Sequence, residues 1–454
     1  MNTPELELHP GLRRRTLVVG LGRTGLSVVR FLATRGVEVA VTDTRLSPPG
    51  HDELVEELPD VAMFLGGFDP SAFDSAGQIV LSPGISLAEP LIVAALERGI
   101  PVFGDIEIFA LHAHAPVVGI TGSNGKSTVT TLLGDAAREA GWKVGVGGNI
   151  GTPALDLLHE PGIDLYVLEL SSFQLETTHS LRCAAATVLN VQEDHMDRYD
   201  GFEHYAQTKA RVLRDAEFVV LNHDDAVVRE MGRDASPVSE RVSFSIEERG
   251  AAYRLAAGPD GAWLCARGES VLPVERMRLK GRHNQANALA ALALADAVGL
   301  PREAVATALA RFTGLRHRTQ WLGEWEGVTW INDSKGTNVG ATRAALLGLP
   351  GKQVLIAGGD GKGADFTPLR SALAEKGRAL VLFGRDGPLI AAAVGDVVPV
   401  EKAHSLEHAI ELAARLAVPG DTVLFSPACA SFDMYRNFEA RGDAFIEAVG
   451  ARFP

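Results

Sequence analysis

The sequence has no long apolar segment and few cysteines. None of its hydrophobic runs approaches the ~20 residues that a membrane-spanning helix requires, so we expect no membrane partner. Its first residues, MNTPELELHPGLRRR, lack the apolar core of a signal peptide, which predicts a cytoplasmic protein. The three cysteines lie far apart and do not have metal-cluster spacing, as expected in a reducing compartment (Cys183, Cys265, Cys429).

An excess of positive charge is also missing. The chain has 43 Lys and Arg against 57 Asp and Glu, a formal net charge of −14. Nucleic-acid binding depends mainly on neutralising phosphates with Lys and Arg, so we expect no nucleic-acid partner. Local cations must therefore attract any anionic substrate. The length of 454 residues, of which 46% are hydrophobic, is enough for about three domains of roughly 150 residues each.

The first predicted segment, residues 1–104, opens with a nucleotide-binding pattern. An apolar strand at 16–19 leads into the glycine turn 20–25, a helix that stops at Gly36, and a strand at 37–43 that ends in Asp43. This order is typical of a βαβ unit that binds a nucleotide diphosphate at the helix N-terminus. A tight turn without a ligand is the alternative, and a dehydrogenase that binds NAD would share the pattern.

The second predicted segment, residues 105–314, contains a phosphate-binding loop. An apolar strand at 116–121 is followed by GSNGKST at 122–128 and a helix. Backbone N–H groups of such a loop cradle phosphates, the lysine (Lys126) reaches the β and γ oxygens, and the next hydroxyl (Ser127) binds Mg²⁺. Ile120 stands where the usual pattern has its first glycine, so the loop is a variant. The segment therefore predicts an ATP site.

Further along this segment, single polar residues are candidates for the same site. Glu169 lies near the end of a buried strand, where a carboxylate is costly unless it is paired or binds a metal. His195 follows the next strand and is relevant only if the fold brings it beside Glu169. Residues 240–280 predict antiparallel hairpins, and the Asn residues of His283-Asn284-Gln285-Ala286-Asn287 either cap a helix or contact a purine.

The third predicted segment, residues 315–454, again alternates strands and helices. The expected strands are 328–332, 353–357, 379–383 and 422–425. Polar residues follow these strands, at the sheet edge where open parallel sheets bind ligands: Asp333, Ser334, Lys335, Asp360, Lys362, Arg385, Asp386, Ser426 and Ser431. Because the segment lacks a complete phosphate-binding motif, we expect it to complete a site rather than form one alone.

Several strings in the three segments match one protein family. TGSNGKST, LYVLELSSFQLE, LNVQEDHMDRY, WINDSKGTN, GGDGKGADF and SPACASFDMYRNFEARG, with LGRTGLS and TDTR nearer the N-terminus, resemble the Mur ligases, in particular the branch that adds D-glutamate. The matches extend from about residue 16 to residue 442.

The resemblance implies an α/β fold with three domains: an N-terminal Rossmann-like UDP-sugar domain (1–104), a central P-loop ATPase-like domain (105–314) and a C-terminal Rossmann-like amino-acid domain (315–454). It also implies a monomeric cytoplasmic enzyme of peptidoglycan precursor synthesis. With ATP and two Mg²⁺ ions, this enzyme would join D-glutamate to UDP-N-acetylmuramoyl-L-alanine through an acyl phosphate.

Residue by residue, the resemblance assigns the following sites. UDP-sugar binding falls on Arg23, Thr24, Asp43, Thr44, Arg45 and Asn149. ATP binding falls on Gly122, Ser123, Asn124, Gly125, Lys126, Ser127, Thr128, Asn284, Asn287, Arg318, Asp333 and Lys335. Thr337, Lys362, Ser431 and Phe438 would bind the amino acid. Lys126, His195, Lys209, His317 and Lys335 would be catalytic, and Ser127, Glu169, His195 and a carboxylated Lys209 would hold the metal.

Three alternatives remain open at this stage. An NAD-dependent dehydrogenase would explain the first segment but not the P-loop. A P-loop regulatory ATPase would hydrolyse ATP without an amino acid. Another Mur ligase would add a different amino acid, and Phe432 bears on this choice because it stands where a smaller aliphatic residue is common.

Overall fold

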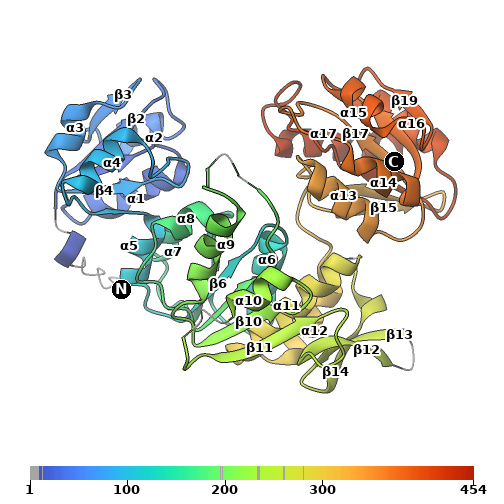
Figure 1. Ribbon diagram of the computed structural model, residues 1–454, viewed down its shortest axis with the longest axis horizontal. Coiled ribbons are helices and arrows are strands. Elements are labelled where there is room, and N and C mark those ends of the chain that lie inside the picture. Colours follow the sequence, from blue (N-terminus) through green and yellow to red (C-terminus); the bar gives the residue numbers. More distant parts are fainter. Residues whose placement is uncertain are drawn as a thin grey trace. The chain divides into compact units, whose positions relative to one another are not determined.

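The computed structural model describes residues 10–12, 14–194, 196, 198–232, 236–258, 261–279 and 281–453 (Figure 1). Its contacts divide the chain into two compact units. Unit 1 comprises residues up to Leu272 together with Ala288–Ala308, and unit 2 comprises Pro273–Asn287 and Leu309–Pro454. Within the described ranges, every helix is too short or too polar to cross a membrane.

Unit 1 begins with a five-stranded parallel sheet of order β3-β2-β1-β4-β5 (Figure 1, blue). Strands β1 and β4 are buried along their whole length, as expected for apolar strands covered on both faces. The chain order reverses between β1 and β4, which is where doubly wound sheets bind ligands. The strands are β1 Thr16–Val19, β2 Val39–Asp43, β3 Ala62–Leu65, β4 Gln78–Leu81 and β5 Val102–Phe103; the helices are α1 Arg23–Ala33, α2 His51–Glu57, α3 Pro70–Ser75 and α4 Pro90–Glu97.

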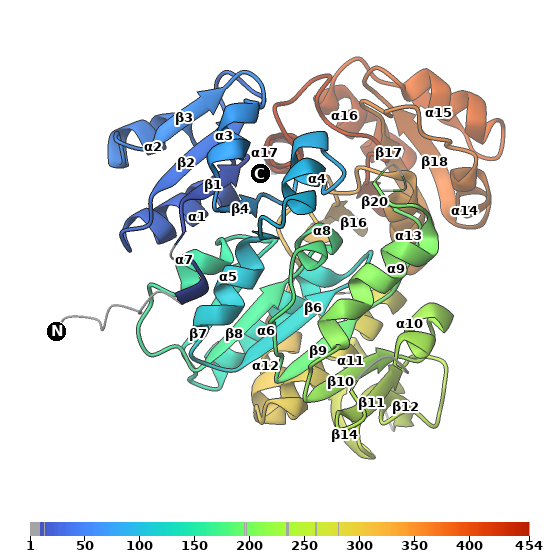
Figure 2. The same ribbon diagram turned by 60° about the vertical axis from the view of Figure 1, so that its left-hand side comes forward.

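The second sheet of unit 1 has nine strands in the order β14-β13-β12-β11-β10-β9-β6-β8-β7 (Figure 2). Strands β6 and β8, which carry the P-loop and Glu169, lie side by side. The strands are β6 Val117–Thr121, β7 Val144–Gly148, β8 Leu165–Glu169, β9 Ala185–Val188, β10 Phe218–Asn222, β11 Glu240–Ser245, β12 Tyr253–Gly258, β13 Gly261–Ala266 and β14 Glu269–Pro273. The helices of this part of the chain are α5 Asp105–His112, α6 Lys126–Glu139, α7 Ala154–Leu157, α8 Ser172–Glu176, α9 Phe202–Ala210, α10 Ala226–Met231, α11 Arg282–Ala297 and α12 Arg302–Arg311.

The prediction of antiparallel hairpins over residues 240–280 was partly wrong. Strands β12 and β13 do form an antiparallel pair, from Tyr253↔Ala266 to Gly258↔Gly261. Strand β11, however, runs parallel to both β10 and β12 and extends the parallel part of the sheet. The alternation of polar and apolar residues shows that one face of a strand is exposed, but it does not show the direction of its neighbour.

Unit 2 is built on a six-stranded sheet of order β15-β16-β20-β17-β18-β19, in which only the edge strand β15 is antiparallel among the described pairs. Helices cover both faces, and the apolar side chains form one cluster on each face. The strands are β15 Gln320–Trp325, β16 Val328–Asn332, β17 Gln353–Ala357, β18 Gly377–Leu382, β19 Val400–Lys402 and β20 Thr422–Phe425; the helices are α13 Val339–Gly348, α14 Pro368–Lys376, α15 Gly387–Val394, α16 Leu406–Leu416 and α17 Phe438–Arg452.

The predicted α/β fold class is therefore correct, with a largely parallel sheet in each of three regions. Each sheet lies within one of the three predicted ranges, although the domain boundaries themselves stay a prediction.

Candidate active site

The P-loop connects β6 to α6 and is held in shape by the chain that follows β9. Its Ser123 N–H donates to the Asn190 carbonyl oxygen at 2.9 Å, and its Asn124 N–H donates to Asn190 Oδ1 at 2.8 Å. The Gln192 N–H in turn donates to Ser123 Oγ at 2.9 Å. Gly125, with φ +86°, precedes the first residue of α6 in a conformation that favours glycine. The loop thus has a fixed shape at a helix N-terminus, where anions bind.

Lys126 folds back over this loop. Its Nζ donates to the carbonyl oxygens of Gly122 at 2.8 Å and Ser123 at 3.0 Å. Ser127 is buried in the first turn of the same helix, with 2% exposure. The lysine is therefore poised above the loop, and phosphate oxygens would replace the two carbonyls as its partners.

Glu169 lies beside the P-loop because it pairs with Ile120 across the neighbouring strands β8 and β6. Its Oε1 accepts a hydrogen bond from Asn149 Nδ2 at 2.8 Å. Its Oε2 is buried and has no hydrogen-bond partner among the described residues. A buried carboxylate oxygen without a partner is costly, and oxygen ligands are the ones that Mg²⁺ prefers. The side chain therefore fits the predicted metal role.

Lys209, on α9, reaches the same loop. Its Nζ donates to the Gly122 carbonyl oxygen at 3.1 Å and lies 4.5 Å from the ring centroid of Tyr205. The side chain is 2% exposed, and burial together with the charge of Lys126 lowers its pKa to about 7. A large fraction of the amine is therefore neutral at neutral pH, which is the form that reacts with CO₂.

The predicted metal set also includes His195. His195 lies outside the described residues, so its position relative to Glu169 stays a prediction. Within the described ranges, no group of three or more His, Cys, Asp and Glu side chains has metal-binding geometry. The combination of Ser127, Glu169, His195 and Lys209 therefore remains a hypothesis.

The glycine turn of the first sheet has the shape of a diphosphate site. A Cβ atom at Gly25 would lie 1.9 Å from the Gly20 carbonyl oxygen, so only glycine permits this approach of helix and strand. A Cβ at Gly22 would meet nothing within 4 Å, which leaves that backbone open to a ligand. Thr24 is partly buried and Arg23 exposed at the start of α1, where anions bind.

Asp43 is buried at the end of β2 and organises this turn. One carboxylate oxygen accepts from the Leu21 N–H at 2.8 Å and from Arg45 Nη2 at 2.7 Å. The other accepts from the backbone N–H and the Nε of Arg45, both at 2.9 Å. Burial raises the pKa of Asp43, but the bonds from Arg45 and Leu21 outweigh it and hold the pKa at about 2. Asp43 thus orients Arg45, which is exposed together with Thr44, and direct contact of Asp43 with a nucleobase stays a prediction.

Replacing Asp43 with Ala is expected to raise the KM for a UDP-sugar substrate at least ~10-fold, because charge-assisted bonds that fix the turn and Arg45 are lost. The KM for ATP should stay within about twofold, since its loop lies on another sheet. Steady-state kinetics with each substrate varied will measure both. The exposed Asp52→Ala is the matched control, and an equal rise in both KM values would contradict the assignment.

Asn149 follows β7 and supports Glu169 directly. Its N–H donates to the Glu169 carbonyl oxygen at 2.8 Å, in addition to the bond between their side chains. The predicted contact of Asn149 with the sugar substrate therefore remains a hypothesis, while its contact with Glu169 is clear.

In unit 2, Asp333 and His317 are buried at the end of β16. Asp333 accepts from Ser426 Oγ at 2.7 Å and from the Thr319 N–H at 2.9 Å, and burial raises its pKa to about 6. His317, 3% exposed, has its Nδ1 3.0 Å from Asn332 Nδ2, and burial lowers its pKa. These contacts indicate that His317 supports the end of β16, where Asn332 lies. Its predicted catalytic role stays a prediction.

Residues predicted to contact ATP follow in the same unit. The Lys335 N–H donates to the His317 carbonyl oxygen at 2.9 Å, and its Nζ lies 4.6 Å from the ring centroid of Phe438. The buried side chains of Asn284 and Asn287 are hydrogen-bonded to each other at 3.2 Å. Helix α11 begins at Arg282, so both Asn residues lie inside it and the alternative interpretation as helix caps was wrong. Arg318 contributes to the charge environment of Asp333.

The predicted amino-acid residues lie at the carboxyl ends of the strands of unit 2. The loops of Lys362 and Ser431 are joined by the backbone pair of Asp360 and Ala430, with bonds of 3.0 and 2.8 Å. Lys362 is exposed, and its Nζ lies 5.4 Å from the ring centroid of Phe432, which is 65% exposed. Ser431 is buried, whereas Thr337 and Phe438 are partly buried.

Arg441 is a residue that the sequence analysis did not select. It is 1% exposed, and its guanidinium donates to Ser334 Oγ at 3.0 Å, to the Ser334 carbonyl at 2.8 Å, and to the carbonyls of Cys429 and Ala430 at 3.0 and 3.1 Å. It therefore joins the loops that carry Lys335 and Ser431. An arginine near the start of a helix gives no local signal of burial, so only the fold reveals this role.

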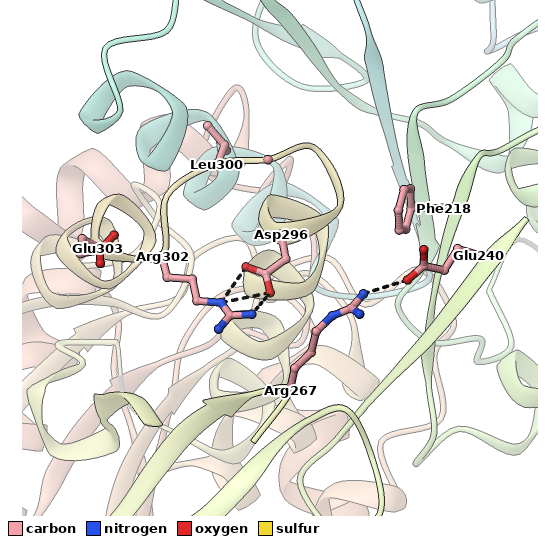
Figure 3. Close-up of a pocket in the computed structure, with 8 residues that line it drawn as sticks. Phe218, Glu240, Arg267, Asp296, Leu300, Arg302 and Glu303 are labelled. Atoms are coloured by element: carbon pink, nitrogen blue, oxygen red, sulfur yellow. Dashed lines mark hydrogen bonds and ion pairs between the residues drawn. The ribbon is translucent and has the colours of Figure 1, made fainter. Parts of the chain in front are cut away.

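A separate pocket of about 580 Å³ opens in unit 1 at the amino ends of β10 and β11 (Figure 3). The P-loop follows the carboxyl end of the parallel strand β6, so the pocket lies at the opposite end of the strands. Four of its charged side chains form two ion pairs: Arg302 with Asp296 at 2.6 Å, and Arg267 with Glu240 at 2.9 Å. The remaining lining residues are Phe218, Gly299, Leu300 and Glu303. This mutual pairing indicates a structural ion-pair cluster rather than a catalytic site.

Three family models match the chain. They are the MurD-like N-terminal domain of Mur ligases over residues 14–104, the Mur ligase middle domain over 120–295, and the glutamate ligase domain of Mur ligases over 317–429. With its P-loop, its parallel sheets and these matches, the chain belongs to the Mur ligase family.

Curated relatives that are about half identical to this chain are named UDP-N-acetylmuramoylalanine--D-glutamate ligase. The protein of Nitrosococcus oceani is 53% identical over 97% of this chain and 98% of its own length. That of Marinobacter nauticus is 53% identical over 96% of this chain and 98% of its own length. Among solved structures, UDP-N-acetylmuramate-alanine ligase of Thermotoga maritima has the same fold, with a TM-score of 0.60 at 18% identity over 97% of this chain and all of that one.

Proposed function

We propose that this protein joins D-glutamate to UDP-N-acetylmuramoyl-L-alanine at the expense of ATP, in the synthesis of peptidoglycan precursors. The observation that carries the proposal is 53% identity, over nearly the whole of both chains, to a relative with that name. The residues agree with it, since a P-loop lysine, a buried carboxylate with an unpartnered oxygen and a second buried lysine converge on one loop.

The chemistry follows from the poor reactivity of a carboxylate toward an amine. The alanine carboxylate attacks the γ-phosphorus of ATP, giving an acyl phosphate and ADP. The amine of D-glutamate then attacks the acyl carbon, loses a proton, and expels phosphate from the tetrahedral intermediate. Lys126 and Lys335 neutralise the charge that builds up as the anionic groups meet. Exclusion of water from the site protects the acyl phosphate from hydrolysis.

The proposed metal site consists of Ser127, Glu169, His195 and a carboxylated Lys209. Carboxylation joins the neutral Nζ to the carbon of CO₂ with loss of one N–H proton, so a cation becomes an anionic oxygen ligand. The unpartnered Oε2 of Glu169 and the lowered pKa of Lys209 support this set. Mg²⁺ would neutralise the phosphate oxygens, and two ions fit the charge of ADP and an acyl phosphate together.

We further propose that the enzyme is a cytoplasmic monomer whose partners are its small-molecule substrates, with no nucleic-acid or membrane partner. The net charge of −14 supports the first exclusion.

Phosphate release, measured against a panel of UDP-muramoyl acceptors and amino acids, tests the proposed reaction. We expect turnover only with UDP-N-acetylmuramoyl-L-alanine, D-glutamate and ATP together. Turnover with L-alanine or a dibasic amino acid would assign another Mur reaction. ATP hydrolysis without either co-substrate would favour the regulatory ATPase, and a change in nicotinamide absorbance would favour the dehydrogenase.

Replacing Lys362 with Ala is expected to raise the KM for D-glutamate at least ~10-fold, because a carboxylate of the amino acid loses its cation. The KM for ATP should stay within about twofold, and acyl phosphate should still be trapped by reduction without amino acid. Lys402→Ala, on the exposed edge strand β19, is the control. If the KM values for both substrates rise equally, Lys362 supports the fold or the ATP site instead.

A further inference from the structure

Arg198 joins the first sheet of unit 1 to the helix that follows Glu169. Its side chain is only 15% exposed. The guanidinium donates to the carbonyl oxygens of Ile85 at 2.5 Å and Gly84 at 3.4 Å. It also lies 3.6 Å from Glu176 Oε2 and 4.6 Å from the ring centroid of Phe173. One side chain thus contacts a loop of the first sheet and helix α8 of the second.

On the first sheet, the contacted loop is part of the nucleotide crevice. It follows β4, and the crevice lies between β4 and β1, where the strand order reverses. Within the loop, Ser82 Oγ donates to the carbonyl oxygen of Gly20, the first glycine of the turn, at 2.8 Å. A Cβ atom at Gly20 would lie only 3.4 Å from Ile85 Cγ1. The loop that Arg198 contacts is therefore packed against the glycine turn.

On the second sheet, α8 begins three residues after Glu169, the last residue of β8. A capping box between Ser171 and Gln174 fixes its first turn. Gln174 Nε2 also donates to the buried Asp105 at 3.1 Å. Glu176 and Phe173, which Arg198 contacts, are therefore part of a short helix that directly follows the strand of Glu169.

Arginine suits this position better than lysine. Its planar guanidinium presents several donors in fixed directions, so it contacts two carbonyls and a carboxylate while stacking on an aromatic ring. Arg198 and Glu176 are 15% and 12% exposed, so salt screens this pair less than a surface pair.

We propose that Arg198 is a positioning residue that couples occupancy of the nucleotide-sugar crevice to the ATP and metal site. A ligand in the crevice fixes the two carbonyls that Arg198 contacts and thereby fixes its guanidinium against α8. Whichever substrate binds first orders this connection for the other, so that each strengthens the binding of the other by the same factor. The inference rests on the proposed function.

Calorimetry on the full chain tests this coupling. The dissociation constant of a non-hydrolysable ATP analogue with Mg²⁺ is measured without and with saturating UDP-N-acetylmuramoyl-L-alanine. For the wild type, we expect the sugar nucleotide to tighten analogue binding at least ~5-fold. Arg198→Met keeps an unbranched aliphatic stem but removes the guanidinium. In this variant the analogue alone should bind within about twofold of the wild type, while the coupling ratio falls to about one.

Two further variants complete the design. Arg198→Lys keeps the charge and much of the side-chain length, and it should retain only part of the coupling. Arg138→Met removes another arginine of unit 1, which pairs with Asp135 on its own helix at 2.9 Å, and it should keep the wild-type ratio.

The possible outcomes distinguish failure of the proposed function from failure of the coupling role of Arg198. Failure of the wild type to bind the sugar nucleotide overturns the proposed function and this inference with it. Normal binding with a wild-type ratio of one, or an unchanged ratio in both Arg198 variants, overturns the coupling role alone. Weaker binding of the analogue without sugar nucleotide, in parallel with a lower unfolding temperature, would assign Arg198 a merely structural role and also overturns it.

Discussion

Replacing Lys126 with Ala is expected to reduce turnover by at least ~10³-fold, because the β and γ phosphate oxygens lose their principal protein cation where charge develops. The fold should persist. The Nζ of Lys126 bonds to carbonyl oxygens of its own loop, whereas the loop is anchored separately through Asn190 and Gln192. Phosphate release and the unfolding temperature are the two measurements.

Lys143→Ala is the matched control for this prediction. Lys143 is exposed, lies beyond the far end of the same helix, and donates to the Pro161 carbonyl at 2.5 Å. Near-normal ligation by Lys126→Ala would mean that the loop at 122–128 is not the ATP site.

Lys209→Ala is expected to be nearly inactive and to regain part of its activity when a small carboxylate such as acetate is added. The substitution removes the proposed carbamate and opens space beside Gly122 and Tyr205, where a free carboxylate can take its place. Initial rates at rising acetate concentration measure the rescue.

Lys209→Arg separates this effect from a simple loss of charge. Arginine keeps the cation but forms no stable carbamate under these conditions, and it fills the space that acetate would need. We expect it to be inactive with or without acetate. Wild-type activity in Lys209→Ala would eliminate the carbamate proposal.

The parts of the fold that were predicted correctly are those with continuous apolar strands. Strands β1, β16, β17 and β20 begin and end at the predicted residues, because buried parallel strands appear in the sequence as short apolar runs. The edge strands β15 and β19 were not predicted. The first, QWLGEW, is only partly buried, and the second has three residues, so neither forms an apolar run.

In the candidate site, too, contiguous motifs were predicted from the sequence, whereas contacts between distant residues were not. The P-loop and the glycine turn are contiguous in the chain, so their sequence specifies their local geometry. Lys209 has no local signal, because its lowered pKa comes from burial in the assembled fold and from the charge of Lys126, and its hydrogen-bond partner Gly122 is 87 residues away. The sequence also did not predict that Asp43 organises the glycine turn or that Arg441 joins two loops of unit 2. Their hydrogen bonds to other parts of the chain form only when the strands are assembled.

Unit 1 is interrupted in the sequence, since Ala288–Ala308 belongs to it and Pro273–Asn287 does not. Residues Ala288 to Ala295 of α11 are at most 1% exposed, so this late segment covers apolar surface of unit 1. During synthesis on a ribosome, chains that have not yet reached this helix would expose that surface, although all nine strands of the central sheet are already made. The newly made chain thus passes through a stage that is prone to aggregation, and a fragment ending at the last strand of that sheet is a poor choice for expression.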